Sequence, residues 1–540
     1  MSPETMMGRV REILEKHWRV RPDDLRRLDL TRDVNPDWFL SQDMVGYIFY
    51  IDKFAGRLRG LPTRIPYLQK LGVTYAHMMP CLLPREGQSD GGYAVKDYRR
   101  IDPDLGSMSD FQTANRSLRD AGISPCIDLV LNHTAKERDW AQKARGGDPF
   151  YQAFYRMFDD DTLPKQYEQS LVEIFPAQAP ENFTYYPDMG KWVWTTFNEY
   201  QWDLNWENPE VFLAILDTIL FLANKGVEVF RHDAVAFMWK RMGTGCQNLP
   251  EVHDILQALT QATRVAASGD TRLMTHVLRH HFPESFQRAC FATYIRCHDD
   301  IGWAITEEDA AHVPHMSGPG HRNFIADFYA GAFDDSPAHG ADFQSNPATG
   351  DRRTNESFAS LAGLEAALEL GDRRATDTAI AHINLGHALI ASFGGIPLIY
   401  MRDELGLMND HTYLDDPASA DDGRWMHRPV MDWNKAGDLD DQSAPPARIF
   451  DGLRHAVTVR KSTPQLASHI PTRIIETGNA GVFGYVRLGD YPAVTCLCNF
   501  TNQTQTVPVQ MAETIDLLTG KTHNNAITLP PTAQSGCAAK

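Results

Sequence analysis

The stretch Val227-Glu-Val-Phe-Arg-His-Asp233 decides the fold, because a short apolar run passes directly into a group of charged side chains. A helical pattern runs before it from Pro209 to Asn224, and Gly226 ends that helix. A short apolar run that follows a helix and a glycine is typical of a buried parallel strand. Polar side chains directly after such a strand lie at its C-terminal end, where barrel enzymes carry their catalytic groups.

The same alternation of strand and helix runs along the chain before this stretch. Strands are predicted at Val45–Ile51, Tyr75–Met79 and Ser124–Leu131, and helices at Leu58–Leu71 and Phe111–Ala121. Much later, a further helix from Thr376 to Phe393 leads into an apolar run that ends at Met401. Helices that alternate with strands at this spacing predict a parallel α/β sheet.

Clusters of Asp, His and Arg side chains follow four of the predicted strands in sequence order. The four groups are Ser89-Asp-Gly-Gly-Tyr93, Asn132-His133, Arg231-His-Asp233 and His298-Asp-Asp300. A single Asp after a strand is usually a helix cap, but four such groups in sequence order are difficult to explain by capping alone. Because the catalytic residues of a (β/α)8 barrel project from several strand ends, the pattern predicts a barrel enzyme.

Three of these stretches, Asn132-His133, Phe230-Arg-His-Asp233 and His298-Asp299, resemble signature regions of the α-amylase superfamily, glycoside hydrolase family 13. The stretch Ser89-Asp-Gly-Gly-Tyr-Ala-Val95 resembles its amylosucrase and sucrose hydrolase branch. Further motifs are similar to those of its amylosucrase and sucrose hydrolase branch: Trp194-Thr-Thr-Phe-Asn198, Gln201-Trp-Asp-Leu-Asn205, Asp233-Ala-Val-Ala-Phe-Met-Trp-Lys240, Arg296-Cys-His-Asp-Asp-Ile-Gly-Trp303 and Arg424-Trp-Met-His-Arg-Pro429. The resemblance covers roughly residues 30–530. It implies an α/β fold, a (β/α)8 TIM-type barrel with an inserted B domain and a C-terminal all-β domain.

The resemblance and the changes of pattern along the chain divide the sequence into segments. These are a residual N-terminal helical segment (1–30), the first part of the barrel (31–133), the B domain insertion (134–205), the continued barrel (206–301), a second loop insertion (302–372), the barrel end (373–464) and a C-terminal β-sandwich domain (465–540). The last segment shows short strands with Gly, Asn and Thr turns, but residues 529–540 lack the apolar alternation expected of a final strand.

The resemblance implies a role for each residue of the motifs. Asp233 would be the nucleophile that forms a covalent β-glucosyl intermediate, Arg231 would keep it ionised and oriented, and Asp299 would stabilise the transition state. The substrate would be bound by Asp90, Tyr93, His133, His298, Asp300, Arg353 and Arg424. Within this set, Tyr93 would stack on the glucosyl ring, and a salt bridge between Asp90 and Arg424 would close the pocket beyond it.

A retaining glycosidase also needs an acid/base carboxyl group, and no motif identifies one. From Asp233 to His298 the chain advances by 65 residues. Two βα units of about 30 residues each must fit there beside a helix and a strand, so the barrel is short of about one βα unit. Either the region of strand five is deleted and Glu284 belongs to a later element, or Leu273-Met-Thr275 is its remnant and His276 stands where the Glu belongs.

The sequence therefore predicts an enzyme that acts on sucrose with retention of configuration. It would transfer glucose to an α-glucan, an oligosaccharide acceptor or water, with no cofactor and no metal. The alternative is a catalytically impaired or inactive homologue that binds sucrose or glucan, because the acid/base residue is not found.

Composition excludes other classes of protein. The 540 residues hold 52 Lys and Arg against 70 Asp and Glu, a net charge of −18, which disfavours binding to nucleic acids and to anionic membranes. The N-terminus lacks the apolar core of a signal peptide, and the eight cysteines are scattered rather than arranged as a disulfide framework. We expect a cytoplasmic protein without a membrane span, and the sequence leaves its oligomeric state open.

Overall fold

The structure is a computed structural model. It describes residues 2–35, 37–176, 179–247, 290–334, 336–346, 350–417, 419–489, 492–508 and 513–539. The chain divides into two compact units. Unit 1 comprises Met1–Asn35, Phe49–Ile65 and Tyr75–Leu249, and unit 2 comprises Pro36–Ile48, Pro66–Thr74 and Pro250–Lys540.

Unit 1 contains three parallel strands with the register that the site requires. Strand β5 (Ser124–Val130) lies between β2 (Tyr75–Met78) and β11 (Val229–Asp233) and pairs in parallel with both. All seven residues of β5 are buried, as expected for a central strand with both faces covered. Helix α5 (Met108–Asp120) packs on β5 and begins at a capping box formed by Ser107 and Asp110. The predicted strands and this helix are therefore present.

Between β5 and β11 the chain forms a set of smaller elements. They are β6 (His133–Ala135), α6 (Asp139–Arg145), α7 (Pro149–Gln152), β7 (Met157–Phe158), α8 (Thr162–Glu168), β8 (Phe183–Tyr186), β9 (Lys191–Trp194), β10 (Gln201–Asp203) and α9 (Pro209–Ala223). The antiparallel pair β6 and β10 places His133 opposite Asp203. An antiparallel pair of strands, β3 (Leu82–Pro84) and β4 (Val95–Ile101), follows β2.

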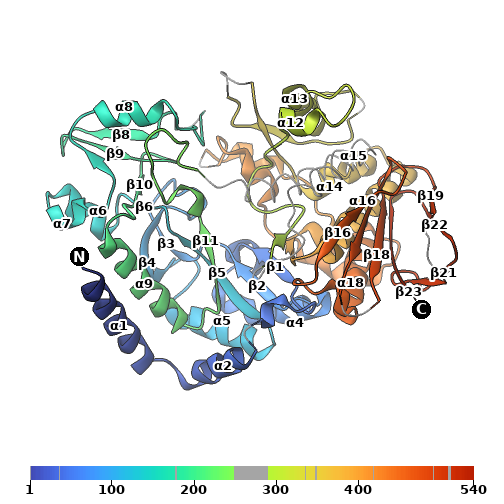
Figure 1. The fold of residues 1–540 in the computed structure, drawn as a ribbon, viewed down its shortest axis with the longest axis horizontal. Helices are drawn as coiled ribbons and strands as arrows, with labels where there is room; N and C mark the ends of the chain where they lie inside the picture. Colours follow the sequence, from blue (N-terminus) through green and yellow to red (C-terminus); the bar gives the residue numbers. More distant parts are fainter. Residues whose placement is uncertain are drawn as a thin grey trace. The chain divides into compact units, whose positions relative to one another are not determined.

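The N-terminal segment forms two helices, α1 (Pro3–Arg19) and α2 (Asp23–Val34), as predicted for its helix-prone sequence. Helix α1 lies along α9 (Figure 1) and is held there by charge. Asp217 of α9 accepts hydrogen bonds from Lys16 at 2.9 Å and His17 at 2.6 Å, and it also pairs with Arg99. Lys16 and His17 make Asp217 a polar centre of the α1–α9 contact, and Arg99 adds a third partner from β4 (Val95–Ile101).

Unit 2 contains a second group of three parallel strands. Strand β15 (Ile396–Tyr400) pairs with β1 (Gly46–Phe49) on one side and with β12 (Ala292–Thr293) on the other. Helix α16 (Arg373–Phe393) leads directly into β15, as predicted, and packs against α18 (Pro445–Ser462). The preceding insertion contains α12 (Glu307–Ala310), α13 (Gly318–Tyr329), β13 (Ala341–Phe343), β14 (Arg353–Asn355), α14 (Phe358–Leu361) and α15 (Leu364–Glu369).

The end of the chain forms antiparallel strands. The larger sheet has the order β16 (Thr472–Ile475), β17 (Val482–Arg487), β18 (Val494–Asn499), β23 (Ala533–Ala539), β20 (Thr514–Asp516) and β21 (Thr522–His523), and β19 (Gln505–Pro508) pairs with β22 (Ala526–Leu529). Although residues 529–540 lack the apolar alternation expected of a final strand, β23 forms there and pairs with both β18 and β20. Its small side chains hide the alternation, and backbone pairing on both edges specifies the strand instead.

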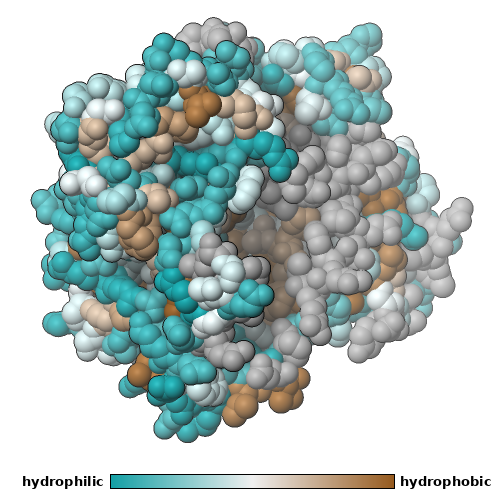
Figure 2. All heavy atoms as spheres, turned by 60° about the vertical axis from the view of Figure 1, so that its left-hand side comes forward, coloured by the Kyte–Doolittle hydropathy of each residue, from teal (hydrophilic) through white to brown (hydrophobic). Residues whose placement is uncertain are grey.

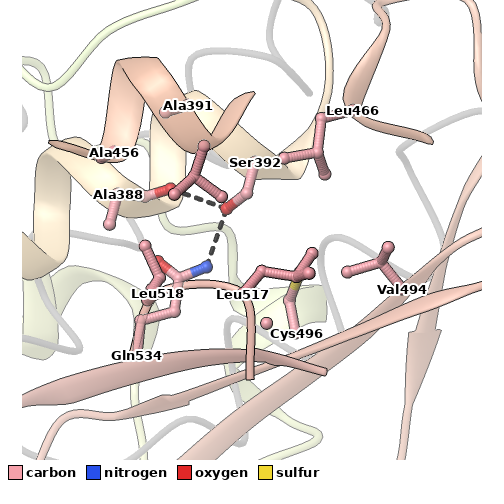
Figure 3. A pocket seen from close by; sticks show the side chains of 12 residues that line it. Ala388, Ala391, Ser392, Ala456, Leu466, Val494, Cys496, Leu517, Leu518 and Gln534 are labelled. Atoms are coloured by element: carbon pink, nitrogen blue, oxygen red, sulfur yellow. Dashed lines mark hydrogen bonds between the residues drawn. The ribbon is translucent and has the colours of Figure 1, made fainter. Parts of the chain in front are cut away.

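A small cavity lies where α16 and α18 meet this sheet (Figure 3). Its volume of about 20 Å³ has room for roughly one water molecule. On one wall Ser392 donates to the carbonyl of Ala388 at 2.6 Å and accepts from the amide of Gln534 at 2.7 Å. The cavity is therefore a packing gap bridged by hydrogen bonds, and it is too small for a sugar.

The coloured part of the surface in Figure 2 is mostly hydrophilic, with hydrophobic residues in separate patches. Among the described residues, no helix combines the length and hydrophobicity needed to cross a bilayer. The seven described cysteines for which a state is assigned have free thiols.

The α1–α9 contact yields a prediction about stability and pH. Burial raises the pKa of Asp217, but the hydrogen bonds from Lys16 and His17 and the charge of Arg99 outweigh burial and lower this pKa to about 2. Because the pKa is depressed in the folded protein, the stabilisation is complete above about pH 4 and is lost as the pH falls towards 2. Asp217→Asn should lower the free energy of unfolding at pH 7 by about 1–2 kcal/mol.

Denaturant unfolding at several pH values measures this difference, with the exposed Asp120→Asn as the matched control. The difference between Asp217→Asn and the parent should shrink between pH 4 and pH 2. Equal unfolding free energies at pH 7 would contradict the ion-pair account of the contact.

Candidate active site

Arg231 connects two carboxylates at the C-terminal ends of β5 and β11. In the parallel register Arg231 lies opposite Asp128, and Asp233 lies opposite Val130. The Nη1 atom of Arg231 donates to Asp128 at 2.8 Å and also to Asp233. The Asp128 side chain is 1% exposed and the Asp233 side chain 19%. A guanidinium between two carboxylates favours the ionised form of both, so Asp233 is held as an oriented anion that remains accessible.

The backbone ends β11 directly after Asp233. Ala234 adopts a left-handed conformation with φ of 56°, which turns the chain away from the strand direction. Asp233 is therefore the last residue of its strand, which is where the catalytic groups of a parallel barrel are found.

Asp128 has a second partner, His77, which belongs to none of the sequence motifs. The Nε2 atom of His77 on β2 lies 3.0 Å from its other carboxylate oxygen, and both side chains are buried. The three parallel strands of unit 1 thus each supply a member of one polar cluster. The signal in the sequence was a single acid inside the apolar run Ser124–Leu131, because a buried carboxylate needs charged or hydrogen-bonding partners.

Tyr93 lies beside this cluster. Its side chain is buried, and the guanidinium carbon of Arg231 is 5.8 Å from the ring centre. Burial raises the pKa of Tyr93 well above its ordinary value, so the ring is a neutral phenol. The turn before it requires glycine at position 92, where φ is 98° and a Cβ atom would approach Pro80 to 2.9 Å.

His133 and Asp90 are connected through Gln201. The Nε2 atom of Gln201 lies 3.0 Å from Nε2 of His133 and donates to Asp90 at 3.2 Å. Burial lowers the pKa of His133 despite the nearby charges of Asp203 and Asp90, so its imidazole is neutral near pH 7. Unit 1 thus contains an ordered group of all five site residues predicted in it.

The other predicted site residues lie in unit 2, around the loop after β12. His298 Nε2 lies 3.3 Å from a carboxylate oxygen of Asp299, and Arg353 pairs with Asp300 at 3.0 Å. Arg424 is nearly buried and pairs with Asp422 at 2.8 Å. Because Asp90 and Arg424 belong to different units, the salt bridge between them stays a prediction.

The backbone of this loop is held by buried side chains. The carbonyl of His298 accepts from Arg428 Nε at 2.8 Å, Arg428 Nη2 at 2.6 Å and His427 Nε2 at 3.1 Å. The carbonyl of Asp299 accepts from Arg296 at 3.1 Å. His427 and Arg428 belong to the Arg424–Pro429 motif, so that motif positions the loop as well as carrying Arg424.

Lys240 anchors the segment that follows Asp233. Its Nζ atom donates to Asp203 at 2.6 Å and to Thr196 at 3.1 Å. The Lys240 side chain is 1% exposed and that of Asp203 is 0% exposed. Burial lowers the pKa of Lys240, and the charge of Asp203 opposes this effect. Since Asp203 pairs in register with His133, one buried ion pair orients both the chain after Asp233 and the strand of His133.

The residues considered for the missing acid lie outside the described part of the structure. This applies to His276, Glu284 and the predicted remnant strand at 273–275. The predicted strand before His298 is present as β12. The proposed shortfall of one βα unit therefore stays a prediction about residues 248–289.

Two buried carboxyl groups of unit 2 have strongly raised pKa values. Burial raises the pKa of Glu356 to about 8, against the opposing charge of Arg296 and a hydrogen bond from Thr354. Burial also raises the pKa of Asp403 to about 8. Both groups are almost fully covered, so they belong to the protein interior and do not reach solvent.

Comparison with known proteins shows which family the chain resembles. Residues 32–293 match the model described as Alpha amylase, catalytic domain. This part of the chain is therefore similar to an α-amylase family catalytic domain. The trehalose synthase of Pimelobacter sp. (strain R48) is 36% identical over 230 residues, which cover 41% of this chain and 39% of that protein. The match thus spans about two fifths of that relative.

Longer matches extend over nearly the whole chain. A glucosylglycerate phosphorylase of Escherichia coli (strain K12) is 25% identical over 556 residues, which cover 95% of this chain and 94% of that protein. The crystal structure of the trehalulose synthase MutB from Pseudomonas mesoacidophila MX-45 has a TM-score of 0.61 and 18% identity, and it covers 93% of this chain and 99% of MutB. The predicted fold class, a barrel with a C-terminal all-β domain, is confirmed. None of these three proteins is an amylosucrase, so membership of the amylosucrase and sucrose hydrolase branch stays a prediction.

The buried ion pair yields a prediction about folding energetics. Lys240→Met should lower the free energy of unfolding by about 3–5 kcal/mol, because it leaves the Asp203 carboxylate buried without its cation. Adding Asp203→Asn should recover part of this loss, and a double-mutant cycle measures the coupling. Lys136→Met is the matched control, since Lys136 pairs with a largely exposed Glu199 and should cost less than about 1 kcal/mol. Equal effects of Lys240→Met and Lys136→Met would be inconsistent with the role assigned to Lys240.

The raised pKa of Glu356 yields a prediction with a defined sign. Because this pKa is higher in the folded protein than in the unfolded chain, folding is favoured at low pH, and this advantage is lost as the pH rises from about 4.5 to 8. Glu356→Gln should therefore be more stable than the parent at pH 8 by about 1–3 kcal/mol, and the difference should nearly vanish at pH 5.

Chemical denaturation at both pH values tests this expectation, with the exposed Glu308→Gln as control. A Glu356→Gln protein that is equally destabilised at both pH values would show that the carboxyl is ionised in the folded state.

Proposed function

We propose that this chain is a retaining glucosyl transferase or hydrolase that acts on sucrose or a closely similar α-glucoside. The observation that carries the proposal is the cluster at the end of β11, where Arg231 holds Asp233 as an accessible carboxylate next to the buried ring of Tyr93. A fixed anion beside a flat apolar ring suits a nucleophile that attacks a sugar stacked on that ring.

In the proposed reaction, the Asp233 carboxylate attacks the anomeric carbon as the bond to the fructosyl oxygen breaks. A general acid protonates that oxygen, and a covalent β-glucosyl ester remains on Asp233. An acceptor hydroxyl then attacks the same carbon, gives its proton to the acid/base and restores the α configuration. The acceptor would be an α-glucan, an oligosaccharide or water, and the acid/base residue is unassigned.

The remaining site residues have roles that follow from the family resemblance. Asp299 would bind sugar hydroxyls and stabilise the transition state, while His133 and His298 would donate hydrogen bonds to the glucosyl ring. Asp300 with Arg353 would contact the fructosyl moiety. Asp90 and Arg424 would close the pocket, which limits the site to one glucosyl unit.

The choice of sucrose is supported by the motifs of the amylosucrase branch and by a structural neighbour, since a mutant of MutB was crystallised with the substrate sucrose. The names of other relatives widen the set of donors and acceptors to be tested, because they include trehalose synthases and glucosylglycerate phosphorylases. The amylosucrase assignment and the cytoplasmic location predicted from the sequence belong to this proposal.

The test separates failure of the nucleophile from failure of the acid. Purified protein is incubated with sucrose, trehalose or α-glucosyl fluoride, and glucose, fructose and fluoride are measured separately. Fluoride departs without protonation, so α-glucosyl fluoride needs Asp233 but no general acid. We expect release from α-glucosyl fluoride and from sucrose, reduced at least about 10³-fold in Asp233→Asn.

The products distinguish transfer, hydrolysis, loss of the general acid and absence of activity. Fructose in excess of glucose means transfer, and equal amounts mean hydrolysis. Release from α-glucosyl fluoride but not from sucrose would mean that the general acid is lost and would favour the impaired homologue. No Asp233-dependent release from any donor would overturn the proposal and leave sugar binding without turnover.

A further inference from the structure

Three consecutive side chains of the loop after β12 can reach one metal ion. The Sγ atom of Cys297, an imidazole nitrogen of His298 and a carboxylate oxygen of Asp299 all lie within 4.8 Å of one another. His298 Nε2 and Asp299 Oδ1 are 3.3 Å apart, and the backbone N–H of Asp299 donates to the Cys297 thiol at 3.5 Å. Among the described residues, this is the one group of three or more His, Cys, Asp or Glu side chains whose ligand atoms lie this close together.

The separations are close to those around a tetrahedral Zn²⁺ ion. Ligands at about 2.0–2.3 Å from zinc are about 3.3–3.8 Å from one another. The His298–Asp299 pair already has this spacing, and the thiol needs to move by no more than about 1 Å, which a rotation of the Cys297 side chain provides.

The backbone that carries these ligands is fixed in advance. The carbonyl of His298 is bound by His427 and Arg428, and the carbonyl of Asp299 is bound by Arg296, all three of which are buried. Little conformational entropy is therefore lost when the loop binds an ion, and a preorganised loop favours metal binding.

The site is also accessible from solvent. The Asp299 side chain is 43% exposed, and Cys297 is half-buried. An entering cation can reach the carboxylate first, and water can occupy the fourth coordination position, as it does in zinc sites with three protein ligands.

We propose that Cys297, His298 and Asp299 form a site for Zn²⁺ or a chemically similar divalent cation that inhibits the enzyme. On binding, the thiol releases its proton to solvent and coordinates as thiolate, the neutral imidazole donates its nitrogen lone pair, and the carboxylate binds through one oxygen. No electron transfer is involved. The motifs of the sequence predicted no metal, and Cys297 is the residue that makes the difference, because thiolate and imidazole favour Zn²⁺ over Ca²⁺ and Mg²⁺.

Inhibition follows because the ion occupies two groups that the substrate needs. His298 and Asp299 would bind sugar hydroxyls, and neither can do so while it coordinates a cation. This consequence rests on the proposed function, whereas the metal site itself does not.

Binding is tested with Co²⁺, which takes the place of Zn²⁺ and is visible by absorption. Titration of the reduced full-length protein with Co²⁺ should produce a thiolate-to-cobalt charge-transfer band that saturates at one equivalent and is abolished by excess Zn²⁺. The band should be absent in Cys297→Ser and retained in Cys290→Ser, a matched control at another partly buried cysteine of unit 2. His298→Ala should weaken Co²⁺ binding at least about 10-fold.

The absence of a thiolate band in the parent, or a band that persists in Cys297→Ser, overturns the proposal. Where turnover is detected, Zn²⁺ should inhibit it, with at least about a 10-fold higher half-inhibitory concentration in Cys297→Ser. Equal Zn²⁺ sensitivity of the parent and Cys297→Ser would overturn the inhibitory role. A protein without turnover still gives the Co²⁺ result, so failure of the proposed function and failure of the metal site are distinguishable.

Discussion

The charge of Arg231 between Asp128 and Asp233 is the interaction on which the arrangement of unit 1 depends. A charge taken out of water costs several kcal/mol unless partners compensate for it in good geometry. Arg231 and Asp128 come from neighbouring strands, and Asp128 is also bound to His77 on the third. A shift of β11 by one residue would turn Arg231 and Asp233 to the opposite face and break these contacts. The strand register and the site are thus specified by the same atoms.

The inserted segment extends this constraint to the loops above the strands. Gln201 and Asp203 belong to one short strand, β10, but they act on different parts of the site. Gln201 connects His133 with Asp90, while Asp203 binds Lys240 and so orients the chain after Asp233. The insertion therefore positions the site residues through buried polar contacts.

The strands of unit 1 and the predicted site residues could be expected from the sequence, because local patterns and short motifs indicate them. The apolar run before Arg231 and the helix that precedes it identify β11, and the motifs identify Asp233 and its neighbours. The partners of Asp128 and Lys240 could not be predicted from local patterns, because each contact joins residues far apart in the chain. Strand β23 has no recognisable pattern for a related reason: its small residues lack apolar alternation, and pairing with β18 and β20 specifies it.

The central claim is that Asp233 forms a covalent bond with a glucosyl unit. The most direct measurement uses a fluorinated α-glucosyl fluoride that forms the intermediate quickly and releases it slowly, followed by intact-protein and peptide mass spectrometry. The account predicts one fluoroglucosyl adduct per chain, located on Asp233 and absent in Asp233→Asn. An adduct on another residue, or no adduct in a folded protein that binds the reagent, would contradict it.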